Sequence, residues 1–157
     1  MLIKLILIGR PKDKTLEERC QEYLRRLRAY GKVESVILPD SDPGSEAKLI
    51  RRELERERGA EIVVLGEEGQ EYTTAELAKK LPAVDRKLVF IVGGPYGVAE
   101  EIKRESAWIW SLSKMTFPHE VARLLLCEQL YRVYNLAHGG SYHHLSESQK
   151  PPREKRR

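Results

Sequence analysis

Two kinds of segment are absent from this sequence of 157 residues. Its apolar runs are all far shorter than the roughly 20 residues that cross a bilayer. Its first residues lead into a strand-like pattern without a cleavable signal peptide. These absences predict a cytoplasmic protein that does not span a membrane. A hydrophobic content of 41% with 33% charged residues is typical of a soluble globular chain.

Cysteine and histidine are scarce. Cys20 and Cys127 lie far apart, each in a segment of helical periodicity, which predicts two buried and reduced thiols. The four histidines show neither an H-x-x-x-H pair nor a Cys/His ligand spacing. The sequence therefore predicts no metal site.

Outside its last residues the chain has no excess of either charge. The formal net charge is +4, and residues 150–157, with five basic side chains and one glutamate, account for all of it. The body, expected to be a single domain over residues 1–145, is therefore not a uniformly basic surface for nucleic acid. Residues 146–157 are expected to form a basic, flexible C-terminal tail.

The stretch IVGGPYG, residues 91–97, follows an apolar run and predicts a tight exit from a buried strand. It lacks the G-x-G-x-x-G spacing, and no Lys-Ser/Thr pair follows it, so neither common nucleotide fingerprint is met. Pro95 also removes an amide donor. The pattern favours a ligand held by carbonyls, a few amides and apolar walls. A plain strand-to-helix turn explains the glycines equally well.

Periodicity along the chain predicts an α/β fold. Strands are expected at residues 2–8, 33–38, 62–65, 88–92 and 108–112, and helices at residues 16–27, 46–58, after Thr73, at 98–104 and after Pro118. Ser45 is expected to cap the second helix, Thr73 and Glu76 to form a capping box, and Pro118 to be the first helical residue. Alternation of this kind predicts a mostly parallel sheet, flanked by helices, with a ligand crevice at the carboxyl ends of its strands.

The helix after Pro118 is expected to bury an apolar stripe. Its members are Val121, Leu124, Leu125, Cys127 and Tyr131, with Tyr134 beyond. The polar side chains between them suit either a solvated face or a homodimer interface.

Together with IVGGPYG, the segments WSLSKMTFPHEVARLLLCEQLYRVYN (residues 110–135) and SYHH (141–144) resemble the RlmH family. Its members are bacterial methyltransferases of the SPOUT superfamily that modify N3 of a pseudouridine in large-subunit (23S) ribosomal RNA. The resemblance runs from the opening LIKLILIG through EYLRRL and VVLGEEG to the late Tyr-His pair. It implies a SPOUT-type fold with a C-terminal trefoil knot, a homodimer, and S-adenosyl-L-methionine as cofactor.

The resemblance also implies site residues. The expected cofactor contacts are Leu65, Gly93, Leu112, Ser113, Lys114, Met115, Thr116 and Phe117. His119, Tyr142 and His143 are expected to act on the target base, the last two from a segment too polar for a core and reaching the other subunit's site. His144 stands where the family has an arginine, so its cationic role could pass to the basic residues at 153–157.

Methylation of a pseudouridine ring nitrogen requires a nearby base, or a cation that favours the anion. The sequence candidates are His119, Arg123, Tyr142, His143 and His144. Two other classes of protein stay open. One is a non-catalytic RNA- or ribosome-binding protein with the same fold. The other is a small nucleotide-binding oxidoreductase, which the missing fingerprints disfavour.

Overall fold

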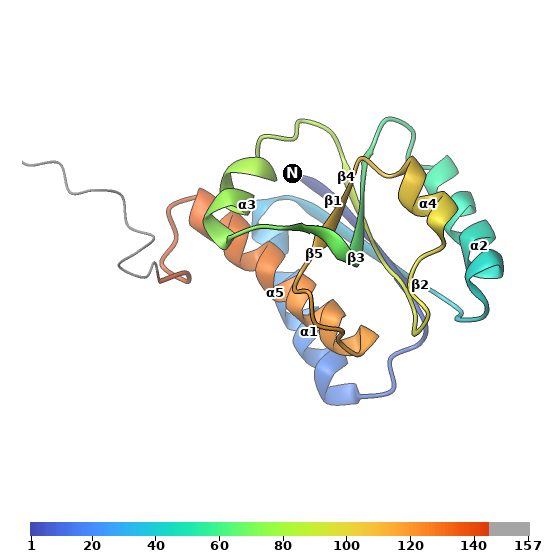
Figure 1. Cartoon of the computed structure of the whole chain (residues 1–157). Helices are drawn as coiled ribbons and strands as arrows, with labels where there is room; N and C mark the ends of the chain where they lie inside the picture. The colour runs from blue at the N-terminus through green and yellow to red at the C-terminus, as the bar shows by residue number, and fades with distance from the viewer. Residues whose placement is uncertain (145–157) are drawn as a thin grey trace, which may run out of the picture.

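The structure, a computed structural model, describes residues 1–144, and the expected basic tail at 146–157 lies outside the described residues. A five-stranded parallel sheet in the order β2–β1–β4–β3–β5 forms its middle layer (Figure 1). The strands are β1 Leu2–Ile8, β2 Lys32–Leu38, β3 Glu61–Glu71, β4 Leu88–Val92 and β5 Trp108–Ser111. The helices are α1 Lys14–Leu27, α2 Pro43–Glu55, α3 Thr74–Lys80, α4 Glu100–Glu105 and α5 His119–Ala137, with a 3-10 turn, η1 Arg28–Tyr30, after α1. The predicted α/β fold is confirmed.

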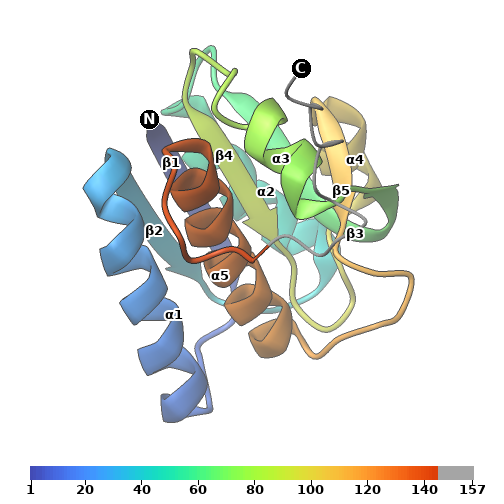
Figure 2. The same ribbon diagram turned by 90° about the vertical axis from the view of Figure 1, so that its left-hand side faces the viewer.

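The strand order explains which face of the sheet each helix covers. The connections from β1 to β2 and from β3 to β4 run in one direction across the sheet, and those from β2 to β3 and from β4 to β5 run in the other. Because such crossovers are right-handed, α1 and α3 lie on one face and α2 and α4 on the other. The last helix, α5, returns to the first face and packs between α1 and α3 (Figure 2).

Each face of the sheet has its own apolar core. Leu5 and Phe90 belong to the core under α1, α3 and α5, whereas Ile6 and Ile91 belong to the core under α2 and α4. Strands β1 and β4 are therefore covered on both faces, which is why their almost continuous apolar runs predicted their observed bounds. The two cysteines are buried with free thiols, as predicted. No helix in the described part of the chain is long and apolar enough to cross a membrane.

Strand β3 is longer than its apolar run predicts. The expected end of the strand at Leu65 is wrong, since β3 continues to Glu71. Its pairing with β5 slips between Leu65 and Gln70, which both pair with Trp110, so that residues 66–69 form a bulge. The polar GEEG sequence looks like a turn, but hydrogen bonding to a strand far along the chain keeps it in the sheet.

Two expected helix starts are wrong and one is confirmed. The side chain of Asp42, and not that of Ser45, caps α2 by accepting from a backbone N–H. Pro118 precedes α5 as its N-cap and is not the first helical residue. Thr73 and Glu76 form the predicted capping box at the start of α3.

The buried face of α5 also differs from the expected stripe. It consists of Arg123, Leu126, Cys127, Leu130, Val133 and Tyr134. Val121, Leu124, Leu125 and Tyr131 are only half-buried. Arg123 lies inside because its Nη2 donates to the carbonyl oxygens of Ile8 and Gly9 at the end of β1. A charged side chain is tolerated in an interior where it finds such acceptors.

A chain of ion pairs lies at the amino-terminal end of the sheet. Nζ of Lys87 is 2.8 Å from a carboxylate oxygen of Glu57 and 3.0 Å from one of Glu34. Hydrogen bonds from Lys32 and Lys87 lower the pKa of Glu34 to about 2. Burial opposes the shift at Glu57, but hydrogen bonds from Lys87 and Lys4 still lower the pKa of that carboxyl.

We expect these ion pairs to make the fold sensitive to acid. Because both carboxyls have a lowered pKa in the fold, their stabilising contribution is complete above the unfolded value of roughly 4 and is lost as the pH falls toward about 2. Lys87→Met should reduce the free energy of unfolding at pH 7 by roughly 1 kcal/mol, because the pairs are partly exposed to solvent. It should also flatten the loss between pH 4 and pH 2. Urea unfolding at both ends of this range measures each effect.

Lys79→Met, at an exposed position of α3, is the matched control. It should leave both the stability at pH 7 and its acid dependence unchanged. Identical acid dependence in the wild type and Lys87→Met would contradict the role of the ion pairs.

Candidate active site

A cavity of ≈ 340 Å³ opens at the carboxyl edge of the sheet. Three segments form most of its wall, namely the β3 bulge after Leu65, the glycine turn after β4, and the loop between β5 and α5. The carboxyl ends of parallel strands meet at one edge, so segments far apart in sequence converge there. The sequence predicted this edge as the ligand crevice.

Most of the expected cofactor residues line this cavity. Seven of the eight do so, namely Leu65, Gly93, Leu112, Ser113, Met115, Thr116 and Phe117. Lys114 is exposed and is not part of the wall. His119 also lines the cavity, from the first turn of α5. Contact between these residues and a cofactor stays a prediction.

Sequence reasoning missed several side chains of the same cavity. They include Glu67, Glu68, Tyr96, Lys103, Trp110 and Ala122. Glu67 and Glu68 belong to the bulge that was expected to be a loop, and Lys103 and Ala122 lie on helices whose patterns resemble ordinary amphipathic surfaces. Lys103 lies outside every motif that the sequence offers. The others lie within the motifs, but only the strand order shows that their side chains reach the cavity.

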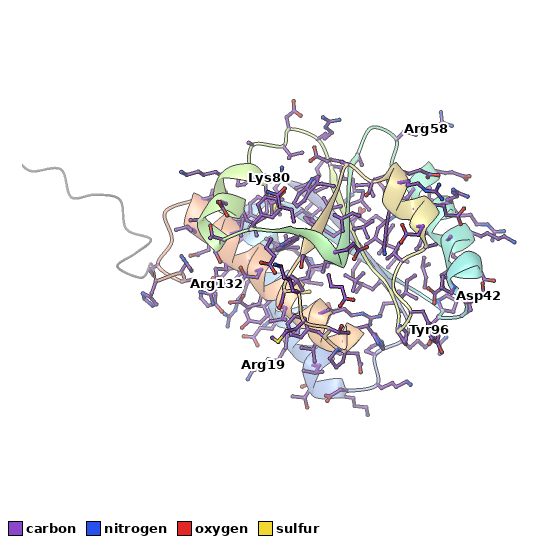
Figure 3. All side chains as sticks on the ribbon, viewed as in Figure 1. Arg19, Asp42, Arg58, Lys80, Tyr96 and Arg132 are labelled. Atoms are coloured by element: carbon purple, nitrogen blue, oxygen red, sulfur yellow. The ribbon has the colours of Figure 1, made fainter. Side chains whose placement is uncertain are left out.

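The glycine turn has a rigid geometry. The carbonyl oxygen of Gly94 accepts from the N–H of Gly97 at 3.0 Å, and Gly97 has a φ of +75°. A β-carbon on Gly93 would lie 2.7 Å from the carbonyl carbon of Gly97 and 2.9 Å from the amide nitrogen of Val98. Gly93 is therefore required by the packing of the turn itself, before any ligand is considered. Tyr96, at the tip of the turn, is 81% exposed (Figure 3).

Side-chain hydrogen bonds fix the loop between β5 and α5. The hydroxyl of Ser111 donates to the carbonyl oxygen of Ser113 at 2.9 Å, and the hydroxyl of Ser113 accepts from the N–H of Met115 at 3.0 Å. The hydroxyl of Thr116 donates to the carboxylate of Glu67 at 2.6 Å. This last bond joins two walls of the cavity, the loop and the β3 bulge.

Tyr142 and His143 do not reach this cavity. Tyr142 packs against the carboxyl-terminal half of α5, with its ring centroid 4.8 Å from that of Tyr131. Its hydroxyl lies 3.2 Å from the carboxylate of Glu128. Figure 3 shows Arg132, which lies over the Tyr142 ring, well apart from Tyr96 at the cavity. Within one chain, only His119 of the three expected catalytic residues lies at the cavity.

The hydrogen bonding of His143 restricts what it can do. Its Nδ1 is 3.2 Å from Nη1 of Arg132, and a guanidinium only donates, so Nδ1 accepts. Burial and the charge of Arg132 lower the pKa of His143, so the ring is neutral near pH 7. A neutral ring that accepts at Nδ1 carries its proton on Nε2. In this arrangement His143 offers a donor, and it can act as a base only after Arg132 releases it.

Arg123 is also unavailable to a ligand in the cavity. It is 1% exposed and is not part of the cavity wall. Its role is to hold α5 against the end of β1. Among residues 1–144, no three His, Cys, Asp or Glu side chains are grouped closely enough to hold a metal ion.

Solved structures share this arrangement of sheet and helices. The tRNA (m1G37) methyltransferase from Aquifex aeolicus superposes with a TM-score of 0.59 at 16% identity, covering 99% of this chain and 79% of that one. A probable methylase family protein from Haemophilus influenzae gives a TM-score of 0.57 at 13% identity, covering 91% and 70% of the two chains. At these identities the likeness shows the fold alone. The family model described as "Predicted SPOUT methyltransferase" matches residues 1–143, so the class of protein is a SPOUT methyltransferase.

Curated relatives narrow this class. The ribosomal RNA large subunit methyltransferase H of Gloeobacter violaceus is 39% identical over an alignment of 150 positions, which covers 92% of this chain and 99% of the relative. The protein of the same name from Bacillus thuringiensis is 37% identical over an alignment of 158 positions, gaps included, which covers 91% of this chain and 99% of the relative. The chain belongs to the RlmH family. The predicted family and the predicted enzyme class are both confirmed.

The two glycines of the turn should respond differently to the same substitution. Gly93→Ala places a carbon against backbone atoms that cannot move aside, so we expect a loss of roughly 2 kcal/mol or more in the free energy of unfolding. Gly97→Ala meets no atom within 4 Å and should cost only about 1 kcal/mol, from its positive φ. Thermal melting distinguishes the two, at roughly 2–4 °C per kcal/mol for a chain of this size. Equal losses would show that the close contact at Gly93 relaxes freely.

Proposed function

We propose that this enzyme methylates N3 of a pseudouridine in large-subunit ribosomal RNA, using S-adenosyl-L-methionine bound in the cavity at the carboxyl edge of the sheet. One observation carries the proposal. Seven residues that the RlmH resemblance assigns to the cofactor, from three distant parts of the sequence, line a single cavity. The names of the relatives support ribosomal RNA as the substrate, and a substrate of that kind supports a cytoplasmic localisation.

The cavity suits such a cofactor. Its ≈ 340 Å³ falls within the usual range of small-molecule sites. Leu65, Leu112 and Phe117 provide apolar walls for a purine ring, and the backbone between residues 112 and 117 provides amides and carbonyls for its polar edge. S-adenosyl-L-methionine supplies a methyl group on a positively charged sulfur. The chain has to hold the two reactants in line and exclude water.

His119 is the best-placed residue to receive the proton of the target nitrogen. An atom at the β-carbon position of Gly9 would lie 3.7 Å from Nε2 of His119 and 3.7 Å from Cγ of Asp40. The imidazole and a carboxylate therefore flank the same glycine at the edge of the cavity. We assign His119 the role of proton acceptor.

The positions of Tyr142 and His143 support a homodimer with a shared site. They follow the carboxyl end of α5, whereas His119 begins it, and 19 helical residues span roughly 28 Å. Neither residue can therefore serve the cavity of its own chain. The half-buried apolar side chains of α5 offer a surface for a second copy. We propose that each tail completes the partner's site, and that the chain forms the family's trefoil knot.

Ala122→Leu tests the cavity as the cofactor site. Ala122 lines the cavity from α5, so a leucine there occupies part of it while keeping a strong helix former in the helix. We expect the affinity for S-adenosyl-L-methionine to fall by about tenfold or more in calorimetry, with a change of only a few degrees in melting temperature. Ala137→Leu, at the exposed end of the same helix, is the control. Full affinity in Ala122→Leu would place the cofactor elsewhere.

Mixed dimers test the shared site. Ala122→Leu subunits have a blocked cavity, and subunits with Tyr142→Phe and His143→Ala have a defective tail. At a cofactor concentration far below the Kd of Ala122→Leu, we expect each homodimer to show little activity on ribosomes that lack the modification. An equal mixture after subunit exchange should recover roughly a quarter of wild-type methyl transfer, because half of the dimers contain one intact composite site.

If subunits exchange and methyl transfer is still not recovered, the tail does not complete the partner's site. Light scattering that gives the mass of a single chain would rule out the dimer itself.

A further inference from the structure

The cavity contains one ion pair whose role is not explained by the fold. Nζ of Lys103 on α4 is 2.6 Å from Oε1 of Glu68 in the β3 bulge and 3.4 Å from Oε1 of Glu100. Lys103 is the one lysine or arginine among the described residues that line the cavity. Its side chain is only 15% exposed. A ligand that enters the cavity with a negative charge has this single cationic partner.

Glu68 is turned toward Lys103 by the absence of a side chain at Gly66. An atom at the β-carbon position of Gly66 would lie 2.6 Å from Oε2 of Glu68, so the carboxylate folds back over the glycine. The hydrogen bond from Lys103 lowers the pKa of Glu68, and the carboxylate stays ionised at neutral pH. The Glu68 side chain is 47% exposed, so a ligand can reach it.

We propose that Lys103 and Glu68 bind the amino-acid end of the methyl donor, with Lys103 facing its carboxylate and Glu68 its ammonium group. The inference rests on the proposed use of S-adenosyl-L-methionine in this cavity. That end of the donor carries both charges on one carbon atom, so it matches an adjacent pair of opposite charges. When Glu68 turns to the ammonium group, Glu100 remains beside Lys103 and keeps it in place.

The mixture of charges argues against other ligand groups at this point. A polyphosphate needs several cationic side chains around it. Here a single lysine lies among the carboxylates of Glu67, Glu68 and Glu100. Ribose hydroxyls need acceptors but no cation. A zwitterion is the group that uses both members of the pair, since each charge removed from water then gains a partner.

Four related ligands test the assignment by calorimetry on the full chain. S-adenosylmethionine and S-adenosylhomocysteine have the complete amino-acid end, decarboxylated S-adenosylmethionine keeps only the ammonium group, and 5′-methylthioadenosine lacks both. We expect Lys103→Met to weaken the first two by about tenfold or more, as for loss of a charge-assisted contact. Binding of the other two should change by less than about twofold.

Glu68→Gln provides a complementary variant. It should weaken every ligand that has the ammonium group, including the decarboxylated one, and spare 5′-methylthioadenosine. Lys103→Arg should retain most of the affinity that Lys103→Met loses. Arg104→Met, at an exposed position of the same helix, should leave all four affinities unchanged. Melting temperatures within a few degrees of the wild type confirm that each variant is folded. If Lys103→Met does not fold, the affinities of Glu68→Gln for the four ligands test the inference instead.

Each remaining outcome is decisive. If Lys103→Met weakens 5′-methylthioadenosine as much as S-adenosylhomocysteine, or weakens neither, the pair does not bind the amino-acid end and the inference is wrong while the cofactor assignment stands. If the wild type binds none of the four ligands, the proposed function fails and the inference fails with it.

Discussion

The buried guanidinium of Arg123 is the contact on which the arrangement of the cavity depends. It lies in the first turns of α5 and donates to the carbonyl oxygens of Ile8 and Gly9, where β1 leaves the sheet. Strand ends leave carbonyls without partners, and burying them unpaired would be costly. By satisfying two of them, Arg123 holds the start of α5 at the carboxyl edge. His119, one turn earlier, and the preceding loop are thereby placed beside the glycine turn.

This attachment also divides the candidate catalytic residues between two distant places. With its first turn held at the carboxyl edge, α5 runs along the sheet between α1 and α3 and releases the chain at the opposite end. There, Tyr142 packs against Tyr131 and Arg132. A rigid helix cannot bring both ends to one ligand. The geometry of a single chain therefore favours an association of two.

A structural feature could be predicted from the sequence where neighbouring residues determine it, and was missed where a distant partner does. β1 and β4 were predicted with their observed bounds because burial on both faces makes nearly every residue apolar, with Lys4 as the exception in β1. The GEEG bulge and the inward Arg123 were missed because a partner far along the chain decides each, β5 in one case and the end of β1 in the other. The cavity was found through its glycine and serine-rich motifs. Lys103 and Glu68 were missed, because nothing in the sequence pairs a residue of VVLGEEG with a lysine on a later helix, and the two meet only in the folded chain.

Charge is also distributed unevenly between the part of the chain that forms the cavity and the part that follows α5. Residues 1–149 have no net charge, so the body has little long-range attraction for RNA phosphates. The cavity wall has Lys103 beside Glu67 and Glu68, a mixture of charges that suits a small zwitterionic ligand better than a polyanion. The excess positive charge follows a few residues after Tyr142 and His143 in the sequence. The residues expected to act on the target base and the basic residues therefore belong to one segment of the sequence. In the proposed dimer, the basic residues would attract RNA phosphates beside the partner's cavity, which the same segment would complete.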